Sequence, residues 1–456
     1  MPFLSRVPAG VLTLLLLAAC DNPARPDPDP EPKPTVPAAP GDALAVLSCT
    51  AQVRTSAVSC KPYDPATDTE GGAEVNARLA SAGASYDGQA GVFSVDMTVQ
   101  NLRVERMGTT DGPTVAGVHV HFLAGPWAPN GKVAVRNAEG SGPAGQPYYR
   151  WPQVLALDAV SQPRRLEFTV PSGVQTFQFW VYVQAPLLPV VVFDRVAENN
   201  RDIWRVALDG SDLVRLTTHA TDDRDPTAGG GTVVFTTFRH NRPELYALPL
   251  VGGAELRLTS TTASEGEPAL TRDGTWLAYT SDAGVGLPKV WTVKTGGGNA
   301  TRAIPSTTDS GVEPEAAPAW HPSGGRLALV ATLRGTADVF DLGLGGAPTL
   351  LQGGNSTAEV DPTWSPDGAY VAYTSNATGS GDIYTVRVAD GAVTRLTFGA
   401  QAEAYPTWTT DGRIVYLEIL ATGERQIRWL DPGVPGRGGV IPVPGGTASR
   451  PHAVPF

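Results

Sequence analysis

From residue 43 onward, short apolar runs alternate with turn residues, and helical spacing is absent between residues 43 and 185. Runs such as GVFSVDMTVQNLRV and QTFQFWVYVQA are separated there by clusters of Gly, Pro, Asn and Asp. Short strands at such distances are typical of an all-β sandwich. Roughly 140 residues can bury a core of their own. We therefore predict an immunoglobulin-like β-sandwich over residues 43–187.

A second pattern repeats itself in the C-terminal half of the chain. The stretch DPTWSPDGAYVAYTS (361–375) has partial copies at 267–281, 317–331 and 405–418, and a degraded copy at 225–238. The prolines of the five copies are 42 to 50 residues apart: Pro226, Pro268, Pro318, Pro362 and Pro406. This period is that of a four-stranded propeller blade. Because the motif recurs, we interpret it as architecture and not as a catalytic site.

Each copy predicts the same local structure. The proline begins a short strand, where its missing N–H costs least. The S-P-D-G sequence supplies a turn, and the strand after it is apolar on both faces, as expected between neighbouring sheets. Six such second strands are predicted, at 190–193, 233–238, 277–281, 327–331, 371–375 and 414–418.

The first predicted unit lacks a proline-containing strand before it, and the end of the chain supplies one. Pro451 in RPHAVPF lies 45 residues after Pro406, which keeps the period. We expect Ala453 and Val454 to lie beside Val191 and Val192. Closure of this kind removes open sheet edges, so the sequence predicts six blades closed by the C-terminal strand.

The order P-x-W-S-P-D-G, a Tyr- or Val-rich strand, I-Y and R-L-T resembles the TolB-like relative of the WD-type propeller repeat. The resemblance covers roughly residues 189–456 and implies a six-bladed TolB-like β-propeller over residues 188–456. It also implies a periplasmic envelope protein whose propeller binds a partner. The α/β domain that precedes the propeller in TolB is not predicted here. Propellers serve binding, scaffolding and catalysis, so the fold alone does not fix an activity.

The chain begins with features of an exported lipoprotein. One basic residue, Arg6, precedes an apolar run at 11–19 that is too short to span a bilayer as a mature helix. The run ends in LAAC, which resembles the bacterial lipoprotein cleavage box. This resemblance implies a signal peptide at residues 1–19, cleavage before Cys20 and a lipid anchor on its thiol. An ordinary signal peptide with an incidental cysteine is the alternative.

Residues 20–42 are predicted to form a tether, since eight prolines stand between Asp21 and Pro40. Such a segment favours an extended conformation, at about 3.1 Å per residue. The two remaining cysteines, Cys49 and Cys60, flank a predicted hairpin. In an exported protein an even pair indicates a disulfide, with a metal pair or free thiols as the alternatives.

Charge and motifs exclude several classes of function. The net charge of −11 argues against nucleic acid as a partner and against a polybasic membrane-docking face. The sequence contains no G-x-S-x-G, P-loop, H-E-x-x-H or C-x-x-C motif. Since these motifs are required where their chemistry is used, we predict that the protein is not an enzyme and needs no cofactor.

Five acidic residues share one position, three residues before the repeat proline: Asp223, Glu265, Glu315, Glu359 and Glu403. The sixth copy has Ala448 there. In a propeller these loops share one face, so the carboxylates are expected to form a ring at the mouth of the channel. Each acid could accept backbone N–H bonds from its own loop. Alternatively, the ring binds a divalent cation such as Ca²⁺ or a basic peptide.

His119 and His121 lie two residues apart on a predicted strand and therefore share a face. Two neutral imidazoles could hold a metal ion, but the spacing identifies no further ligand. A packed or solvated strand face is the alternative.

The sequence as a whole predicts a membrane-tethered lipoprotein of the bacterial cell envelope, on the periplasmic or cell-surface side. Its propeller is expected to bind an envelope protein or peptide without catalysis. Two alternatives remain open at this point. One is a propeller hydrolase or lyase that acts on an extracellular glycan or peptide, and the other is an adhesion protein that binds through the sandwich.

Overall fold

The computed structural model describes residues 32–71, 75–142, 145–284, 286–304, 314–333, 335–354 and 356–455. Every helix or strand assigned within these ranges is a β-strand, which confirms the all-β prediction. None of the described residues belongs to a helix with the length and apolarity needed to cross a membrane. The predicted signal peptide, Cys20 and the first part of the tether lie outside the described residues.

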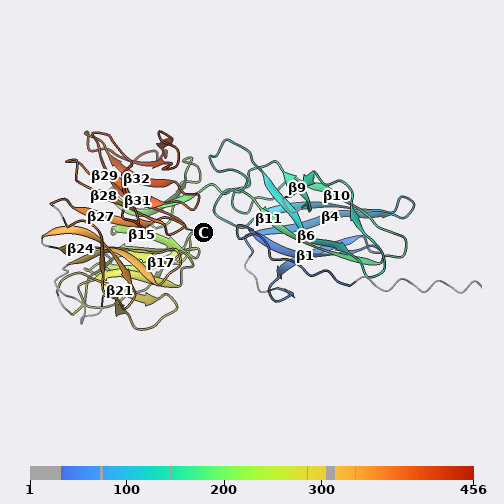
Figure 1. Ribbon diagram of the computed structural model, residues 1–456, viewed down its shortest axis with the longest axis horizontal. Coiled ribbons are helices and arrows are strands. Elements are labelled where there is room, and N and C mark those ends of the chain that lie inside the picture. Colours follow the sequence, from blue (N-terminus) through green and yellow to red (C-terminus); the bar gives the residue numbers. More distant parts are fainter. Residues whose placement is uncertain are drawn as a thin grey trace, which may run out of the picture.

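The N-terminal part contains two sheets that share one apolar core (Figure 1). The seven-stranded sheet, in the order β3-β2-β1-β11-β6-β9-β8, consists of β1 (Ala45–Gln52), β2 (Ala57–Asp64), β3 (Thr69–Glu70), β6 (Val118–Trp127), β8 (Gly140–Ser141), β9 (Pro147–Trp151) and β11 (Thr176–Gln184). The four-stranded sheet, in the order β4-β5-β10-β7, consists of β4 (Ala77–Asp87), β5 (Val92–Asn101), β7 (Ala134–Val135) and β10 (Arg164–Thr169). Alternate residues of both sheets point inward, and the rings of four phenylalanines contact one another in the core: Phe122, Phe168, Phe177 and Phe179.

Cys49 on β1 stands directly opposite Cys60 on β2, and the two sulfurs are bonded. The predicted disulfide is therefore confirmed.

The end of the predicted tether packs on the outer face of the seven-stranded sheet. Val36 is buried with Tyr63 and Trp180. Lys33 Nζ lies 2.9 Å from Asp68 Oδ1 and 5.3 Å from the centroid of the Trp180 ring. Apolar burial and a cation–π contact thus fix residues 33–42 to the folded part.

The C-terminal part forms six four-stranded sheets within the described residues, here numbered sheet 1 to sheet 6. Sheets 1 to 3 consist of β12 (Val190–Ala197), β13 (Asn200–Ala207), β14 (Val214–Arg215) and β35 (Thr447–Ala453); β15 (Asp223–Gly229), β16 (Thr232–Thr237), β17 (Glu244–Pro249) and β18 (Leu256–Arg257); and β19 (Glu265–Leu270), β20 (Trp276–Ser281), β21 (Lys289–Lys294) and β22 (Thr301–Arg302). Sheets 4 to 6 consist of β23 (Glu315–Trp320), β24 (Arg326–Leu333), β25 (Thr336–Gly343) and β26 (Thr349–Gln352); β27 (Glu359–Trp364), β28 (Tyr370–Ser375), β29 (Asp382–Arg387) and β30 (Val393–Arg395); and β31 (Ala402–Trp408), β32 (Ile414–Ile419), β33 (Arg425–Leu430) and β34 (Gly438–Val440).

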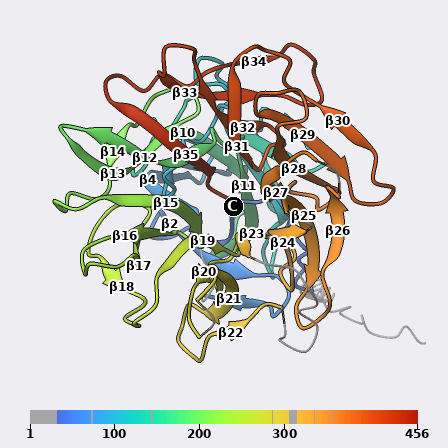
Figure 2. The same cartoon turned by 90° about the vertical axis from the view of Figure 1, so that its left-hand side faces the viewer.

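The six sheets surround a common centre, as Figure 2 shows from the side away from the N-terminal part. Their innermost strands contact one another in the order β15, β19, β23, β27, β31, β35 and again β15. The C-terminal strand β35 pairs with β12, so that Ala453 stands opposite Val191 and His452 opposite Val192. The two ends of the C-terminal part are therefore joined within sheet 1.

The repeated R-L-T sequence holds the outer strands of a sheet together. Its arginine pairs with an acid at or near the start of the third strand, and its threonine hydroxyl accepts a hydrogen bond from the next residue of that strand. In sheet 5, Arg395 Nη2 lies 2.9 Å from Asp382 Oδ1, and the Ile383 N–H donates to Thr397 Oγ1 over 2.9 Å. The same pairings recur for Arg215 with Asp202 and Arg257 with Glu244.

The N-terminal part docks on the side of the ring where the C-terminus lies (Figure 1). Val104 shares a buried apolar cluster with Val190 and Val454. Arg106 Nε lies 2.9 Å from Asp212 Oδ2, and Arg413 Nη2 donates to the backbone oxygen of Thr110 over 2.8 Å. Apolar packing and polar contacts thus join the two parts.

Removing residues 447–456 should unfold the ring of sheets. The deletion exposes the edge of β12, which invites aggregation, and removes Val454, whose burial alone stabilises by roughly 1.5–3 kcal/mol. We expect the truncated chain to lose the cooperative thermal transition of the C-terminal part and to elute as aggregates. The peptide TASRPHAVPF, added in trans, should restore the transition, while a scrambled peptide should not. A truncated monomer with the full chain's unfolding temperature would contradict the closure.

Candidate functional site

The five acids predicted to form a ring stand at or next to the first residue of five innermost strands, and all are buried, with side chains no more than 3% exposed. Each one forms hydrogen bonds or ion pairs within the protein. Glu315 accepts a hydrogen bond from the Val290 N–H over 2.8 Å and lies 3.3 Å from Lys289 Nζ. Glu359 accepts from the Ser375 hydroxyl over 3.1 Å, and Asp223 pairs with Arg239 at 2.9 Å.

These contacts give the five acids local partners, chiefly hydroxyl and cationic side chains. Glu265 accepts from the Thr261 hydroxyl, and Glu403 accepts from the Thr397 hydroxyl over 3.3 Å. Burial raises the pKa of Glu403 to about 7. That this ring also attracts Ca²⁺ or a basic peptide stays a prediction.

A different set of six residues lines the centre of the ring. The residue directly before each repeat proline has a positive φ, between 39° and 54°, although none is glycine: Asp225, Glu267, Ala317, Asp361, Tyr405 and Arg450. The pairing register shifts at this point in all six sheets, which is the sign of a β-bulge. All six residues border one central cavity. We call them the waist ring.

Arg450 crosses part of the waist ring. Its Nε lies 3.0 Å from Asp225 Oδ1, its Nη2 lies 3.7 Å from Glu267 Oε1, and its guanidinium lies 4.9 Å from the centroid of the Tyr405 ring. Burial opposes the charge of Arg450, but the neighbouring carboxylates outweigh it and raise its pKa above the usual value. The guanidinium is therefore held by two carboxylates and an aromatic face.

The opposite part of the waist ring lacks such a cation. Ala317 lies between Glu267 and Asp361 in the order of the sheets, and its N–H donates to Glu267 Oε2 over 2.9 Å. Asp361 accepts a hydrogen bond from the Thr374 hydroxyl over 3.4 Å but has no cation within 4.0 Å in the described part of the chain. Burial raises the pKa of Asp361 to about 6. This half-buried carboxylate has no ion-pair partner among the described residues, although the charge of Arg450 acts on it from further away and lowers its pKa in part.

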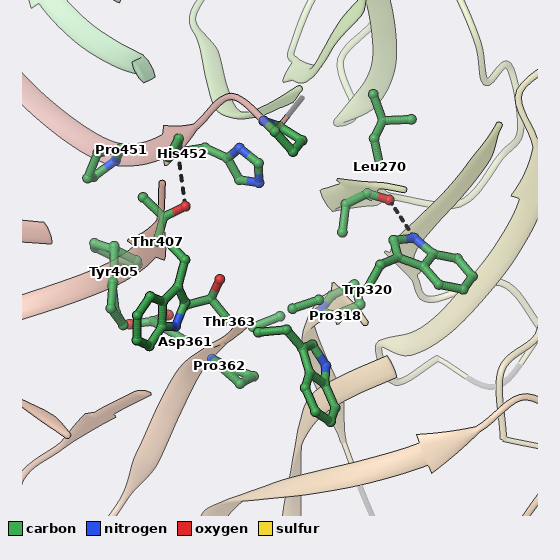
Figure 3. A pocket seen from close by; sticks show the side chains of 18 of the residues that line it. Leu270, Pro318, Trp320, Asp361, Pro362, Thr363, Tyr405, Thr407, Pro451 and His452 are labelled. Carbon is green, nitrogen blue, oxygen red and sulfur yellow. Dashed lines mark hydrogen bonds between the residues drawn. The ribbon is translucent and has the colours of Figure 1, made fainter. Parts of the chain in front are cut away.

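The central cavity extends from the waist ring towards the N-terminal part and has a volume of about 210 Å³ (Figure 3). In each sheet its lining begins at the waist ring residue and continues along the innermost strand through the repeat proline. Tyr405 and Asp361 border it on one side and Trp320 on another (Figure 3). Nine prolines and the rings of Trp320, Trp364, Tyr405 and Trp408 contribute rigid parts of its wall.

Three buried nitrogen atoms in this wall have no hydrogen-bond partner among the described residues: Trp364 Nε1, Trp408 Nε1 and His452 Nδ1. By contrast, the equivalent indole N–H of Trp320 donates to the backbone oxygen of Ala269 over 3.0 Å. Burial lowers the pKa of His452 to about 4, which keeps its imidazole neutral at pH 7. These nitrogens belong to residues that line the cavity, but the atoms themselves are buried beneath its surface.

A second cavity, of about 820 Å³, lies between the N-terminal part and the ring of sheets. Asn76 and residues 102–105 form one wall, and the turns that follow the innermost strands of sheets 2, 3 and 4 form the other. Arg272, Pro322 and Pro455 line both cavities. We call it the junction cavity, and it adjoins the central cavity through these shared residues.

His119 and His121 lie on β6 with their ring centroids 5.9 Å apart, and His121 stacks on Tyr182 at 4.9 Å. Burial lowers the pKa of both imidazoles. Within the described ranges, no three His, Cys, Asp or Glu side chains form a group that could hold a metal ion. A metal site at this pair stays a prediction.

Comparisons with known proteins agree with the repeat. Residues 306–432 match the family described as TolB beta propeller domain. TolB from Acinetobacter baumannii superposes with a TM-score of 0.52 over 59% of this chain and 67% of that chain, at 18% identity. The propeller is TolB-like.

Two other solved structures superpose on this chain with lower TM-scores. A putative TolB from Agrobacterium tumefaciens has a TM-score of 0.48, with 17% identity over 58% of this chain and 96% of that chain. An oligogalacturonate lyase in complex with manganese has a TM-score of 0.41, with 14% identity over 55% of this chain and 73% of that chain. The search of curated proteins found no match.

The replacement Asp361→Asn should change how stability depends on pH. Because the pKa of Asp361 is about 6 in the folded protein, the folded state holds a proton between about pH 4 and pH 6 that the unfolded chain releases. The contribution of Asp361 to the free energy of unfolding therefore falls as pH rises through this window. The stability of the variant relative to the parent should rise by roughly 1–3 kcal/mol from pH 4 to pH 7.

Urea unfolding followed by tryptophan fluorescence measures this difference at each pH. Glu424→Gln, which removes an exposed carboxylate, serves as the control. If the difference between Asp361→Asn and the parent stays constant across the window, Asp361 does not hold the extra proton.

Proposed function

We propose that this chain is a lipid-anchored protein of the bacterial cell envelope, on the periplasmic or cell-surface side, and that it binds a protein or peptide without catalysis. In this proposal residues 43–187 form an immunoglobulin-like sandwich and residues 188–456 form a six-bladed propeller. The observation that carries the proposal is the central cavity of the TolB-like propeller. Its wall includes the half-buried Asp361 carboxylate, which has no ion-pair partner among the described residues, and two indole N–H groups without described acceptors lie just beneath its surface.

The groups in the cavity wall suit recognition of an extended segment. Buried polar groups without partners are costly, so a ligand gains from binding if the indoles of Trp364 and Trp408 shift and donate to it. The volume of about 210 Å³ is below the roughly 300–1,000 Å³ of sites that enclose a drug-sized molecule. It suits a few residues of a partner's chain, while the rest of the partner remains outside.

The location of the protein is inferred from the chain start and from the disulfide. Disulfides persist in oxidising compartments outside the cytosol, so the bond between Cys49 and Cys60 supports export. The LAAC sequence that ends at Cys20 supports lipid attachment. Residues 33–42 pack on the folded part. We propose that residues 20–32 form the tether, whose proline-rich sequence would span about 40 Å if extended.

Cys20→Ser should release the protein from the membrane. The substitution removes the thiol that carries the lipid, and with it most of the membrane affinity. In a detergent phase partition of the full-length chain we expect the parent in the detergent phase and Cys20→Ser in the aqueous phase. A variant that still enters the detergent phase would show that Cys20 is not the anchor.

A photo-crosslinking residue in the central cavity should capture the partner. Thr363 lines the cavity (Figure 3), whereas Val393 lies exposed on the outer strand β30. We expect a probe at position 363 to trap one defined envelope protein or peptide at least tenfold more than a probe at position 393. Equal or absent capture at the two positions would reject the cavity as the binding site.

A further inference from the structure

We propose that the central cavity binds a segment with a basic side chain, which occupies the place beside Ala317 between Glu267 and Asp361. In this proposal the segment enters from the junction cavity. It does not enter from the open face of the ring, which is the face where the innermost strands begin and which lies away from the N-terminal part. The inference rests on the proposed binding function of the propeller and adds the chemistry of its ligand and the direction of access.

The charges of the waist ring support a basic ligand. Three of its six residues are acids, Asp225, Glu267 and Asp361, while Arg450 is its one cation. Two of the three acids hold Arg450 directly, and Asp361 has no cation within ion-pair distance in the described chain. A lysine or arginine side chain would place its charge beside a half-buried carboxylate that has no ion-pair partner in the described chain.

Arg450 shows how the waist ring binds a cation. Its guanidinium lies between Asp225 and Glu267 and faces the ring of Tyr405. Across the ring, Glu267 and Asp361 flank a residue whose side chain is a single methyl group, Ala317. The position beside Ala317 thus has two carboxylates and no cationic side chain of its own. A partner's basic side chain would complete the ring in the way that Arg450 does on the other side.

The unused donors of the wall point to a peptide rather than a simple amine. Trp364 is 6% exposed, and its indole N–H has no acceptor in the described chain; the indole of Trp408 also lacks one. A peptide carries a carbonyl oxygen at every residue, and such an oxygen accepts from an indole N–H. Both indole nitrogens lie beneath the surface of the wall, so the indoles must shift when a segment binds. The segment then satisfies the carboxylate with its side chain and the indoles with its backbone.

The shape of the two cavities indicates the direction of access. The lining of the central cavity starts at the waist ring and includes no residue before it in any innermost strand. Arg450 spans the waist ring towards Asp225 and Glu267 and narrows it on that side. At its other end the cavity shares Arg272, Pro322 and Pro455 with the junction cavity. The wide approach is therefore the one walled partly by the N-terminal part.

The charge requirement is tested with short capped peptides and the full-length chain in detergent. The probes are Ac-Ala-Ala-Lys-Ala-Ala-NH₂, its arginine counterpart, and a norleucine counterpart that has the same length without the charge. We expect calorimetry to show the basic peptides binding at least tenfold more tightly than the norleucine peptide. Equal affinities would overturn the basic ligand.

Variants separate the waist ring from the overall charge of the protein. Asp361→Asn and Glu267→Gln should each weaken binding of the lysine peptide about tenfold, because each removes one carboxylate that flanks Ala317. Glu424→Gln makes the same change of net charge on an exposed loop and should leave binding unchanged. Thermal unfolding verifies that each variant is folded. Equal losses in all three variants would attribute binding to the net charge and overturn the site.

Labelled cysteines test the direction of access. Ser323 is exposed and lines the junction cavity, while Ala400 is exposed in the loop that leads into β31 on the open face. A bulky maleimide on Ser323→Cys should abolish binding of the lysine peptide, and the same label on Ala400→Cys should not. The reverse result would place access on the open face.

The outcome for the ligand is distinguishable from the outcome for the proposed function. If the probe at Thr363 captures a defined partner but no basic peptide binds, the basic ligand is wrong and the binding function stands. If neither occurs, both are wrong.

Discussion

The pairing of β35 with β12 is the constraint on which the rest of the structure depends. Without it, sheet 1 would lack its innermost strand, and β12 would present unpaired backbone groups to solvent. The same strand carries Arg450, the one cation of the waist ring, and its continuation contributes Val454 to the cluster that joins the two parts. Closure of the ring, the charge of the waist and the docking of the N-terminal part thus depend on the last ten residues of the chain.

The backbone conformation of the waist ring is costly and is imposed by the surrounding sheets. A residue with a side chain in the left-handed region costs roughly 1–2 kcal/mol, and six such residues stand at one level of the ring. The bulges persist because each lies within an innermost strand that pairs with the second strand of its sheet on both sides of the bulge. Their effect is to turn the same position of every innermost strand towards the axis, which gathers six side chains of different chemistry around one cavity.

Much of the fold could be predicted from the sequence because it depends on residues that repeat at a fixed period or occur as a pair. The proline period identified the repeat, Pro451 identified the strand that pairs beside Val191, and the even cysteine pair identified the disulfide. The burial of the five acids could not be predicted in the same way, since their partners come from other parts of the fold, such as Arg239 in the turn after β16 and Val290 on β21.

The waist ring could not be predicted from the sequence, for a different reason. Its members share a register, directly before the repeat proline, but not a residue type, and the positive φ of Asp361 or Tyr405 follows from a bulge that no single side chain encodes. The repeat was recognised from residues that its copies share. The waist ring position occurs in every copy but holds a different type of residue in most of them. The varied residue directly before each repeat proline was therefore the signal that could have identified the candidate site at the central cavity.

The packing of residues 33–42 on the outer sheet connects the tether with the cavities. Proline-rich composition predicts an extended chain, but an extended segment can also lie flat on aromatic rings, and Val36 and Lys33 do so against Trp180. The tether is thus fixed to the N-terminal part, and that part is fixed to the ring by Val104 and Arg106. Residues 33–42, the N-terminal part and the ring are consequently connected by direct packing, and Val104, which joins the two parts, also lines the junction cavity.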